Sequence, residues 1–297
     1  MRPVLRWAMP VLIAAVALAS TGCGDKSPER TPTGASERTP TVRRAPDAGD
    51  LGLVTAMAVA PSLGAADSFA VLGSSTVTNT GPTIVNGDLG LSPGAAVVGF
   101  PPGIVNGTIQ AANAASLAAQ NSITTAYNAL AGQACDLDLS GTDLGGLTLT
   151  PGAYCFSTSA QLTGTLTLDG QGNAGAVWVF QIGSTLTTAS NSRVQFINSG
   201  RNCGAFWQVG SSATLGTTTA FAGNILALAS ITLNTGATSD GALFARTGAV
   251  TLDSNVVNRI GSCGSGAPPV PTLPEVAKWG LVAILLATGV FVLSRRG

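Results

Sequence analysis

Short stretches that alternate hydroxyl-bearing and apolar residues are the part of this sequence best suited to chemistry at a surface. Three of them contain Thr214, Thr232 and Thr251, which recur at an almost constant interval. Side chains alternate between two faces along a strand, so the apolar neighbours of each threonine point inward and the Ser/Thr set points outward. A threonine hydroxyl can anchor water, while its methyl group and restricted χ1 limit competing arrangements. This pattern predicts a surface that holds water in an ordered array.

The same pattern extends backwards with looser spacing, through residues 184–188, 160–163 and 75–79. Stacked strands would place such stretches about 4.8 Å apart, with alternate side chains about 6.7 Å apart along each strand. Glutamine and alanine break the hydroxyl pattern at two positions, and threonine is in any case common on strand surfaces. The candidate face comprises Thr76, Thr78, Gln161, Thr163, Thr185, Thr187, Ser212, Thr214, Ser230, Thr232, Ala249 and Thr251.

The chain contains no histidine, which excludes several kinds of site. Without imidazole there is no Ser-His-Asp triad, no Cys-His pair and no zinc site with an imidazole ligand. Residues 67–263 contain four Arg, eight Asp and no Lys or Glu, a net charge of −4. A phosphate-binding surface needs clustered Lys and Arg, so nucleic acid is excluded as a partner. We expect no cofactor.

Cysteine usage indicates disulfides. Apart from Cys23, the chain has Cys135, Cys155, Cys203 and Cys263, an even number that predicts two disulfides in an exported protein. Four cysteines allow three pairings, of which we favour 135 with 155 and 203 with 263. By the loop-entropy model each bridge would stabilise the fold by about 3 to 4 kcal/mol. No CxxC spacing occurs, which disfavours a metal site.

Three aspartates, Asp136, Asp138 and Asp143, lie close together in the sequence. Carboxylate oxygens suit calcium. However, no complete EF-hand loop or calcium-binding nonapeptide repeat accompanies them, so a solvated loop is favoured over a metal site.

The elements that position the hydroxyl stretches are short strands. Each of the three regular stretches follows a short apolar segment, at residues 205–209, 224–227 and 242–245. A strand, turn and strand unit repeated at fewer than about 20 residues is too short for a propeller blade and is typical of one coil of a β-solenoid.

One segment, residues 109–131, is rich in alanine and has no Gly or Pro. Its apolar residues roughly follow helical spacing, so we expect one amphipathic helix that lies along the solenoid and covers an apolar flank. The residues expected to pack inward are Ala112, Leu117, Ile123, Tyr127 and Leu130.

Five motifs, in order along the chain, carry a family resemblance: FAVLGSSTVTNTGP at 69–82, VNGDLGLSPG at 85–94, LTPGAY at 149–154, AVWVFQI at 176–182 and AFWQVG at 205–210. Over about residues 67–260 the chain resembles the microbial ice-binding protein family. The resemblance implies a mainly β fold, a right-handed discontinuous β-solenoid of triangular section with one long α-helix alongside. It also implies that one flat face binds the surface of ice, without enzymatic activity.

Two other classes of function stay open on the sequence. One is a structural or adhesive surface domain whose hydroxyl face meets a glycan or nothing. The other is a polysaccharide-acting enzyme, but hydrolysis needs paired carboxylates in one cleft, and Asp169, Asp240 and Asp253 lie in or beside Gly/Asn turns. Trp178 and Trp207 lie in apolar strands, which favours the core over a sugar-stacking platform.

The amino-terminal part has the composition of an export signal. Residues 1–22 carry arginines before an apolar stretch too short to span a bilayer, which predicts a secretory signal. Small residues before Cys23 resemble a bacterial lipobox, so lipidation of Cys23 and an ordinary signal are both open. Residues 23–50 are typical of a solvated tether. Residues 51–66 form a second apolar segment and an alternative signal region.

The carboxy-terminal part begins with a Gly/Pro linker at residues 264–271. Residues 272–297 contain Pro-Thr-Leu-Pro-Glu, a short apolar run and two arginines, an order that resembles a bacterial carboxy-terminal sorting tag. That resemblance implies export and sorting machinery as partners, and a plain membrane anchor is the alternative. Either one places the folded domain, residues 67–263, outside the cytoplasm or at the bacterial cell surface, the outer membrane being one such surface. We expect a monomer.

Overall fold

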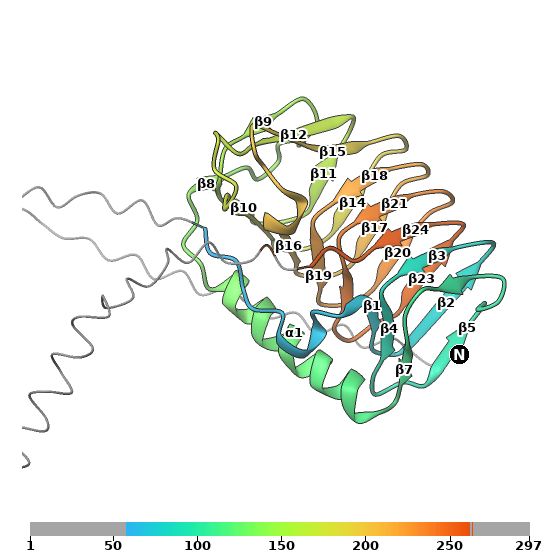
Figure 1. Cartoon of the computed structure of the whole chain (residues 1–297). Helices are drawn as coiled ribbons and strands as arrows, with labels where there is room; N and C mark the ends of the chain where they lie inside the picture. Colours follow the sequence, from blue (N-terminus) through green and yellow to red (C-terminus); the bar gives the residue numbers. More distant parts are fainter. Residues whose placement is uncertain (1–57, 262, 264–297) are drawn as a thin grey trace, which may run out of the picture. The chain divides into compact units, whose positions relative to one another are not determined.

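The computed structural model describes residues 58–261 and residue 263, and these form a three-sided β-solenoid with one long helix alongside (Figure 1). Each complete coil contributes one short strand to each of three parallel sheets, which we call A, B and C. The strand, turn and strand repeat in the sequence therefore predicted the fold class correctly.

The three sheets are parallel throughout their described pairings. Sheet A runs in the order β7 (Ile109–Ala111), β4 (Asp88–Leu91), β1 (Phe69–Gly73), β22 (Leu243–Ala245), β19 (Asn224–Ala227), β16 (Ala205–Val209), β13 (Trp178–Ile182), β10 (Gly152–Phe156) and β8 (Leu137–Asp138). Sheet B runs in the order β11 (Ala160–Leu162), β14 (Leu186–Thr188), β17 (Ala213–Leu215), β20 (Ile231–Leu233), β23 (Val250–Asp253), β2 (Thr76–Thr80) and β5 (Ala96–Val98). Sheet C runs in the order β6 (Ile104–Val105), β3 (Ile84–Asn86), β24 (Val256–Asn258), β21 (Thr238–Asp240), β18 (Ala220–Ala222), β15 (Arg193–Ile197), β12 (Thr165–Asp169) and β9 (Thr148–Leu149).

The stack is discontinuous in sequence. The first strands β1, β2 and β3 pair with the last strands β22, β23 and β24, one pair in each sheet. The chain thus lays down its first coils at one end, crosses to the other end, and returns coil by coil to close against its own beginning.

The interior of the solenoid is apolar and contains a column of aromatic rings. Phe180 and Trp207 stack with ring centroids 3.8 Å apart and planes 8° apart, and Tyr154 and Phe221 extend the column on either side. The indole N–H groups of Trp178 and Trp207 each donate to a backbone carbonyl at 3.1 Å. Both tryptophans are completely buried, which confirms their assignment to the core.

A second apolar layer joins sheet A to the helix α1 (Ala114–Ala131). Ile123, Tyr127 and Leu130 of the helix pack with Phe206 and Phe244 of the sheet. At about 1.5 Å per residue and about 4.8 Å per coil, 18 residues of helix span between five and six coils. The helix is therefore the return path that the discontinuous topology requires, and it leaves sheets B and C uncovered.

The helix begins later than the sequence predicted. Residues 109–111 form β7 on the edge of sheet A, and Asn113 caps the helix by accepting from the Ser116 N–H at 3.0 Å. Ile123, Tyr127 and Leu130 are buried as predicted, but Ala112 is exposed and Leu117 is 54% exposed. Those two inward assignments were wrong. Ala112 precedes the N-cap Asn113 and lies outside the helix, and Leu117 is not on the face where Ser116, Ala119 and Gln120 are buried.

Part of the segment assigned before the domain also belongs to the fold. Residues 58–66 lie against α1, with Leu63 and Ala66 buried beside it and a 3-10 helix at Gly64–Ala66. None of the described helices is long and apolar enough to cross a membrane. The predicted export signal, Cys23 and the segment 272–297 lie outside the described residues.

Candidate functional site

Five threonines form one row along the outer face of sheet B. The strand pairings place Thr187, Thr214, Thr232, Thr251 and Thr78 side by side on five neighbouring strands. We call these five residues the threonine row. Gln161 takes the next position at one end and Val98 at the other.

A second row lies two residues earlier on the same strands and consists of small residues. We call it the serine row. Its members, in order along the sheet, are Ser159, Thr185, Ser212, Ser230, Ala249, Thr76 and Ala96.

The inward side chains fix the direction of both rows. Leu186, Ala213, Ile231, Val250 and Val77 alternate with the outward residues, and each is at most 1% exposed. Because a one-residue slip would turn this apolar set to solvent, the register of sheet B is strongly specified. The buried residues therefore hold the outward side chains of both rows in fixed positions.

Hydroxyl groups in the two rows have different partners. In the serine row, Ser159 and Thr185 share a hydrogen bond of 2.8 Å between their hydroxyls, and the Ser230 hydroxyl accepts the Ala249 N–H at 3.2 Å. In the threonine row, Thr78 donates to Thr251 at 3.4 Å. Among the described residues, the other three hydroxyls of the threonine row have no hydrogen-bond partner. These three hydroxyls are therefore available to water.

Neither row contains a charged residue. Beyond Gln161 the face ends at Asp143, which forms an isolated parallel bridge with Gln161. Burial acts to raise the pKa of Asp143, but hydrogen bonds from the N–H groups of Thr163 and Gly145 and from the Thr163 hydroxyl outweigh it, and the pKa lies below its ordinary value. An ionised carboxylate thus marks one end of the face, and Val98, 56% exposed, marks the other.

Ten of the twelve residues proposed from the sequence lie in these two rows, and an eleventh, Gln161, continues the threonine row at one end. The exception is Thr163, which follows Leu162 of β11 and is therefore in line with Ala189, the residue after Thr188. Ser159 occupies the serine-row position instead, and it was not predicted from the sequence, nor were Ala96 and Val98. A signal for Ser159 was present, because it lies two residues before Gln161 in the alternation.

The other candidate residues serve the fold. Asp136 accepts the Ala153 N–H at 2.7 Å and Asp138 accepts the Ser140 N–H at 2.8 Å. Within the described residues no three His, Cys, Asp or Glu side chains gather as a metal site would require.

The favoured disulfide pairing is the one observed. Cys135 bonds with Cys155 and Cys203 with Cys263, across sequence separations of 20 and 60 residues. The second disulfide ties the segment after the last coil to the connection before β16.

Known proteins and solved structures are similar to this chain in sequence and in fold. The family model described as ice-binding-like matches residues 71–258. An ice-binding protein from Nostoc sp. (strain HG1) is 53% identical over 232 residues, which cover 76% of this chain and 85% of that protein. A crystal structure of an ice-binding protein from an Antarctic biological consortium matches with a TM-score of 0.67 and 46% identity, covering 68% of this chain and 92% of that one. The structure of an ice-binding protein from the Antarctic ascomycete Antarctomyces psychrotrophicus matches with a TM-score of 0.66 and 42% identity, over 69% of this chain and 100% of that one.

Proposed function

Because the chain belongs to the ice-binding-like family, we propose that it binds ice, and that it does so through the outer face of sheet B. The observation that carries the choice of face is the threonine row, five residues of one type in register on five adjacent strands. No enzyme-like cleft or cofactor is needed for this activity, only a regular surface.

The physical basis is a match between fixed hydroxyls and ordered water. Strand pairing spaces the threonines about 4.8 Å apart, and β-branching restricts each side chain at χ1. Hydroxyls held in this way can bind water in a repeating array, and the methyl groups between them discourage other arrangements. A charged residue would oppose adsorption because its desolvation is unfavourable, and the two rows have none.

Substitutions on the threonine row test the proposal. Thr232→Tyr and Thr251→Tyr place a bulky ring in the middle of the face, and we expect each to lower ice-recrystallisation inhibition and thermal hysteresis at least tenfold. Thr125→Tyr is the matched control, because Thr125 is exposed on α1, which covers sheet A. Circular dichroism would establish that all variants fold. An inactive, folded wild-type chain would contradict ice binding, and two fully active row variants would contradict the choice of face.

We also propose that the chain is exported to the outside of the cell or to its surface. The two disulfides support this, because such bonds persist in oxidising compartments. Lipidation of Cys23, the membrane link and recognition of residues 272–297 by sorting machinery remain proposals from the sequence.

We further propose that the protein is not an enzyme. The eight aspartates between residues 67 and 263 all accept hydrogen bonds or form an ion pair within the fold. They are spread over several coils, where they bind backbone N–H groups and turn side chains. That distribution supports a structural role for the carboxylates.

A further inference from the structure

The two ends of the described domain leave the solenoid at the same edge. Each coil passes through sheet A, then B, then C, so the connections from C to the next strand of A form one edge of the three-sided stack, which we call the C–A edge. The chain enters at the start of β1 in sheet A and leaves after β24 in sheet C. In a three-sided stack the C–A edge lies opposite sheet B.

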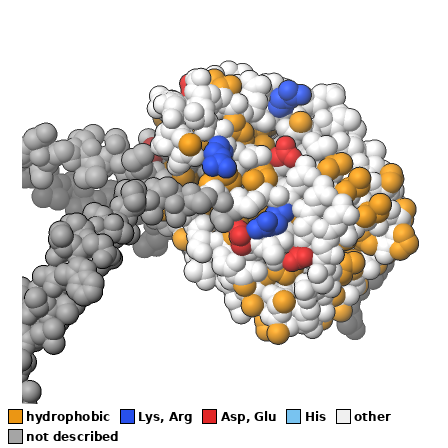
Figure 2. Space-filling model, in the orientation of Figure 1, with side chains coloured by type: hydrophobic (Ala, Val, Ile, Leu, Met, Phe, Trp, Pro, Cys, Tyr) orange, Lys and Arg blue, Asp and Glu red, His pale blue; other side chains and the backbone are white. Residues whose placement is uncertain are grey.

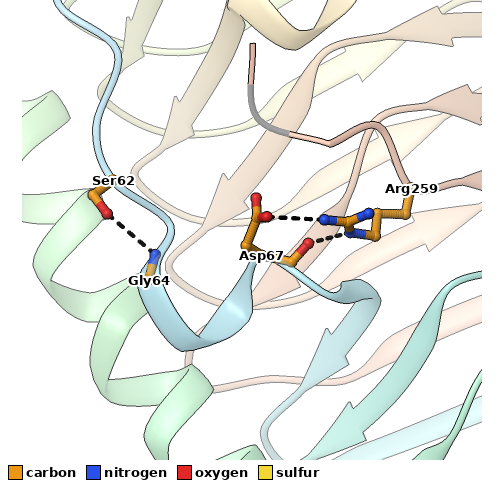
Figure 3. Close-up of polar contacts among 4 residues, drawn as sticks. All are labelled: Ser62, Gly64, Asp67 and Arg259. Carbon is orange, nitrogen blue, oxygen red and sulfur yellow. Dashed lines mark hydrogen bonds and ion pairs between the residues drawn. The ribbon is translucent and has the colours of Figure 1, made fainter. Parts of the chain in front are cut away.

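Specific contacts hold both ends there. Arg259, just after β24, pairs with the Asp67 carboxylate at 2.9 Å, and its Nε donates to the Asp67 carbonyl oxygen (Figure 3). Four residues further on, Cys263 is bonded to Cys203, which lies between β15 of sheet C and β16 of sheet A. The outgoing chain therefore follows the C–A edge.

The incoming chain is held on the helix side of the molecule. The Gln133 side chain accepts from the Val59 N–H at 2.9 Å and donates to the Val59 carbonyl at 2.7 Å. The Ala65 N–H donates to the Ser122 hydroxyl of α1 at 3.2 Å. Because α1 covers sheet A, residues 58–66 also lie away from sheet B.

The charged residues also gather at the C–A edge and are rare on sheet B. Charged side chains are few on the surface in view (Figure 2). Of the four Arg and eight Asp between residues 67 and 263, seven lie at the C–A edge, and Asp253 is the single charged residue in a described strand of sheet B. The seven at the C–A edge are Asp67, Asp88, Asp136, Asp169, Arg201, Asp240 and Arg259.

We propose that the C–A edge is a mounting edge, and that a domain held at the cell surface through either of its terminal segments presents sheet B to ice. This inference rests on the proposed ice binding and extends it from free adsorption to attachment between two surfaces. The sequence continues on both sides of the described domain, before Ala58 and after Cys263. If the chain is attached through either of these segments, the pulling force acts on the edge that carries the ion pair and the disulfide. The threonine row and the serine row then stay free.

The experiment compares two ways of holding the full chain on a bead. A short epitope is inserted either between Gly264 and Ser265 or between Ser190 and Asn191, which are exposed in the turn from β14 of sheet B to β15 of sheet C. Latex beads coated with an antibody fragment against the epitope then capture each protein. We expect beads holding the chain after Gly264 to adhere to a slowly growing ice crystal at least tenfold more than bare beads. We expect beads holding it at Ser190 to adhere no more than bare beads.

The free proteins, measured without beads, separate the possible failures. Equal ice activity of the two free variants establishes that the insertions leave the face intact, and an insertion between Thr217 and Thr218 replaces the Ser190 variant if that variant does not fold. Equal bead adhesion in both orientations, with active free proteins, would overturn the mounting edge alone. Absence of ice activity in the free wild-type chain would overturn the proposed function and this inference with it.

Discussion

A threonine on sheet B combines a hydrogen-bonding group with a side chain that has little freedom to lose. Its hydroxyl donates one hydrogen bond and accepts others, while its second branch at Cβ restricts χ1. Thr214 and Thr232 are half-buried between their row neighbours, which restricts them further. Ordering water on such groups is less opposed by side-chain entropy than it would be on long flexible residues.

Gln161 offers a test by gain of activity. It is exposed, in line with Thr187, and carries a long flexible amide where the row would otherwise continue. We expect Gln161→Thr to extend the row to six threonines and to raise ice-recrystallisation inhibition, on the order of twofold, because one more rigid β-branched hydroxyl joins the grid. Lower activity in a folded Gln161→Thr protein would show that the row does not define the face.

The pH dependence should separate ice binding from stability. Hydrogen bonds from the Ser140 hydroxyl and N–H hold the pKa of Asp138 below its ordinary value of 3.8, and the pKa of Asp143 is also lowered. Since these pKa values are lower in the folded state, their stabilisation is present above about pH 4 and is lost as the pH falls through the folded values. Burial raises the pKa of Tyr154 above 10.0, so its contribution is lost only as the pH rises beyond that value.

We therefore expect a nearly constant melting temperature and ice activity between pH 5 and pH 9, with a fall in melting temperature below about pH 4. The rows of sheet B have no group that titrates in this range, and the chain has no histidine. Thermal melts and recrystallisation assays over this range check both expectations. A step in ice activity near neutral pH, without unfolding, would contradict the assignment of the face.

At the scale of secondary-structure elements, helix α1 contains two large apolar residues that differ strongly in burial. Ile123 is completely buried against sheet A, whereas Leu117 is 54% exposed. We expect Ile123→Ala to lower the free energy of unfolding by about 2 to 5 kcal/mol, and Leu117→Ala to change it by no more than about 0.5 kcal/mol. Chemical denaturation of the two variants measures the difference. Equal losses would mean that the helix packs in another phase.

The same helix shows why the sequence predicted the element but not its orientation. Helical spacing of Ile123, Tyr127 and Leu130 was sufficient for the buried face of the last turns. Gln120 also faces inward, because its amide donates to the carbonyls of Gly73 and Ala245, which are 47 and 125 residues away. No local pattern encodes such partners.

The alignment of residues between neighbouring coils was the second feature that could not be fully predicted from the sequence. The regular coils have an almost constant length, which allowed their threonines to be aligned, but Ser159 and Thr185 are 26 residues apart. The extra residues lie in longer connections, so the alternation was aligned two residues late, with Gln161 and Thr163 taken as the outward pair instead of Ser159 and Gln161. Strand pairing in the structure places Gln161 in line with Thr187, and therefore Ser159 in line with Thr185.

At the scale of the whole molecule, the proposed ice-binding face and the proposed mounting edge depend on the same topology. Pairing of β1, β2 and β3 with β22, β23 and β24 continues sheet B across the junction between the first and last coils, so Thr78 joins Thr251 in one row. The closure also brings Asp67 to Arg259 on the opposite edge. The family resemblance predicted a discontinuous solenoid, but the placement of both ends opposite the hydroxyl rows became visible only from the order of the strands.

The most direct test of the central claim is uptake of the protein into ice. The fluorescently labelled full chain, and a Thr232→Tyr/Thr251→Tyr double variant shown to be folded, are each present in dilute solution while a single ice crystal grows slowly on a cold finger. We predict that the wild type becomes incorporated into the crystal, and that the double variant is left in the liquid as ordinary solutes are. Exclusion of the folded wild type from the ice, or equal incorporation of both proteins, would contradict ice binding by sheet B.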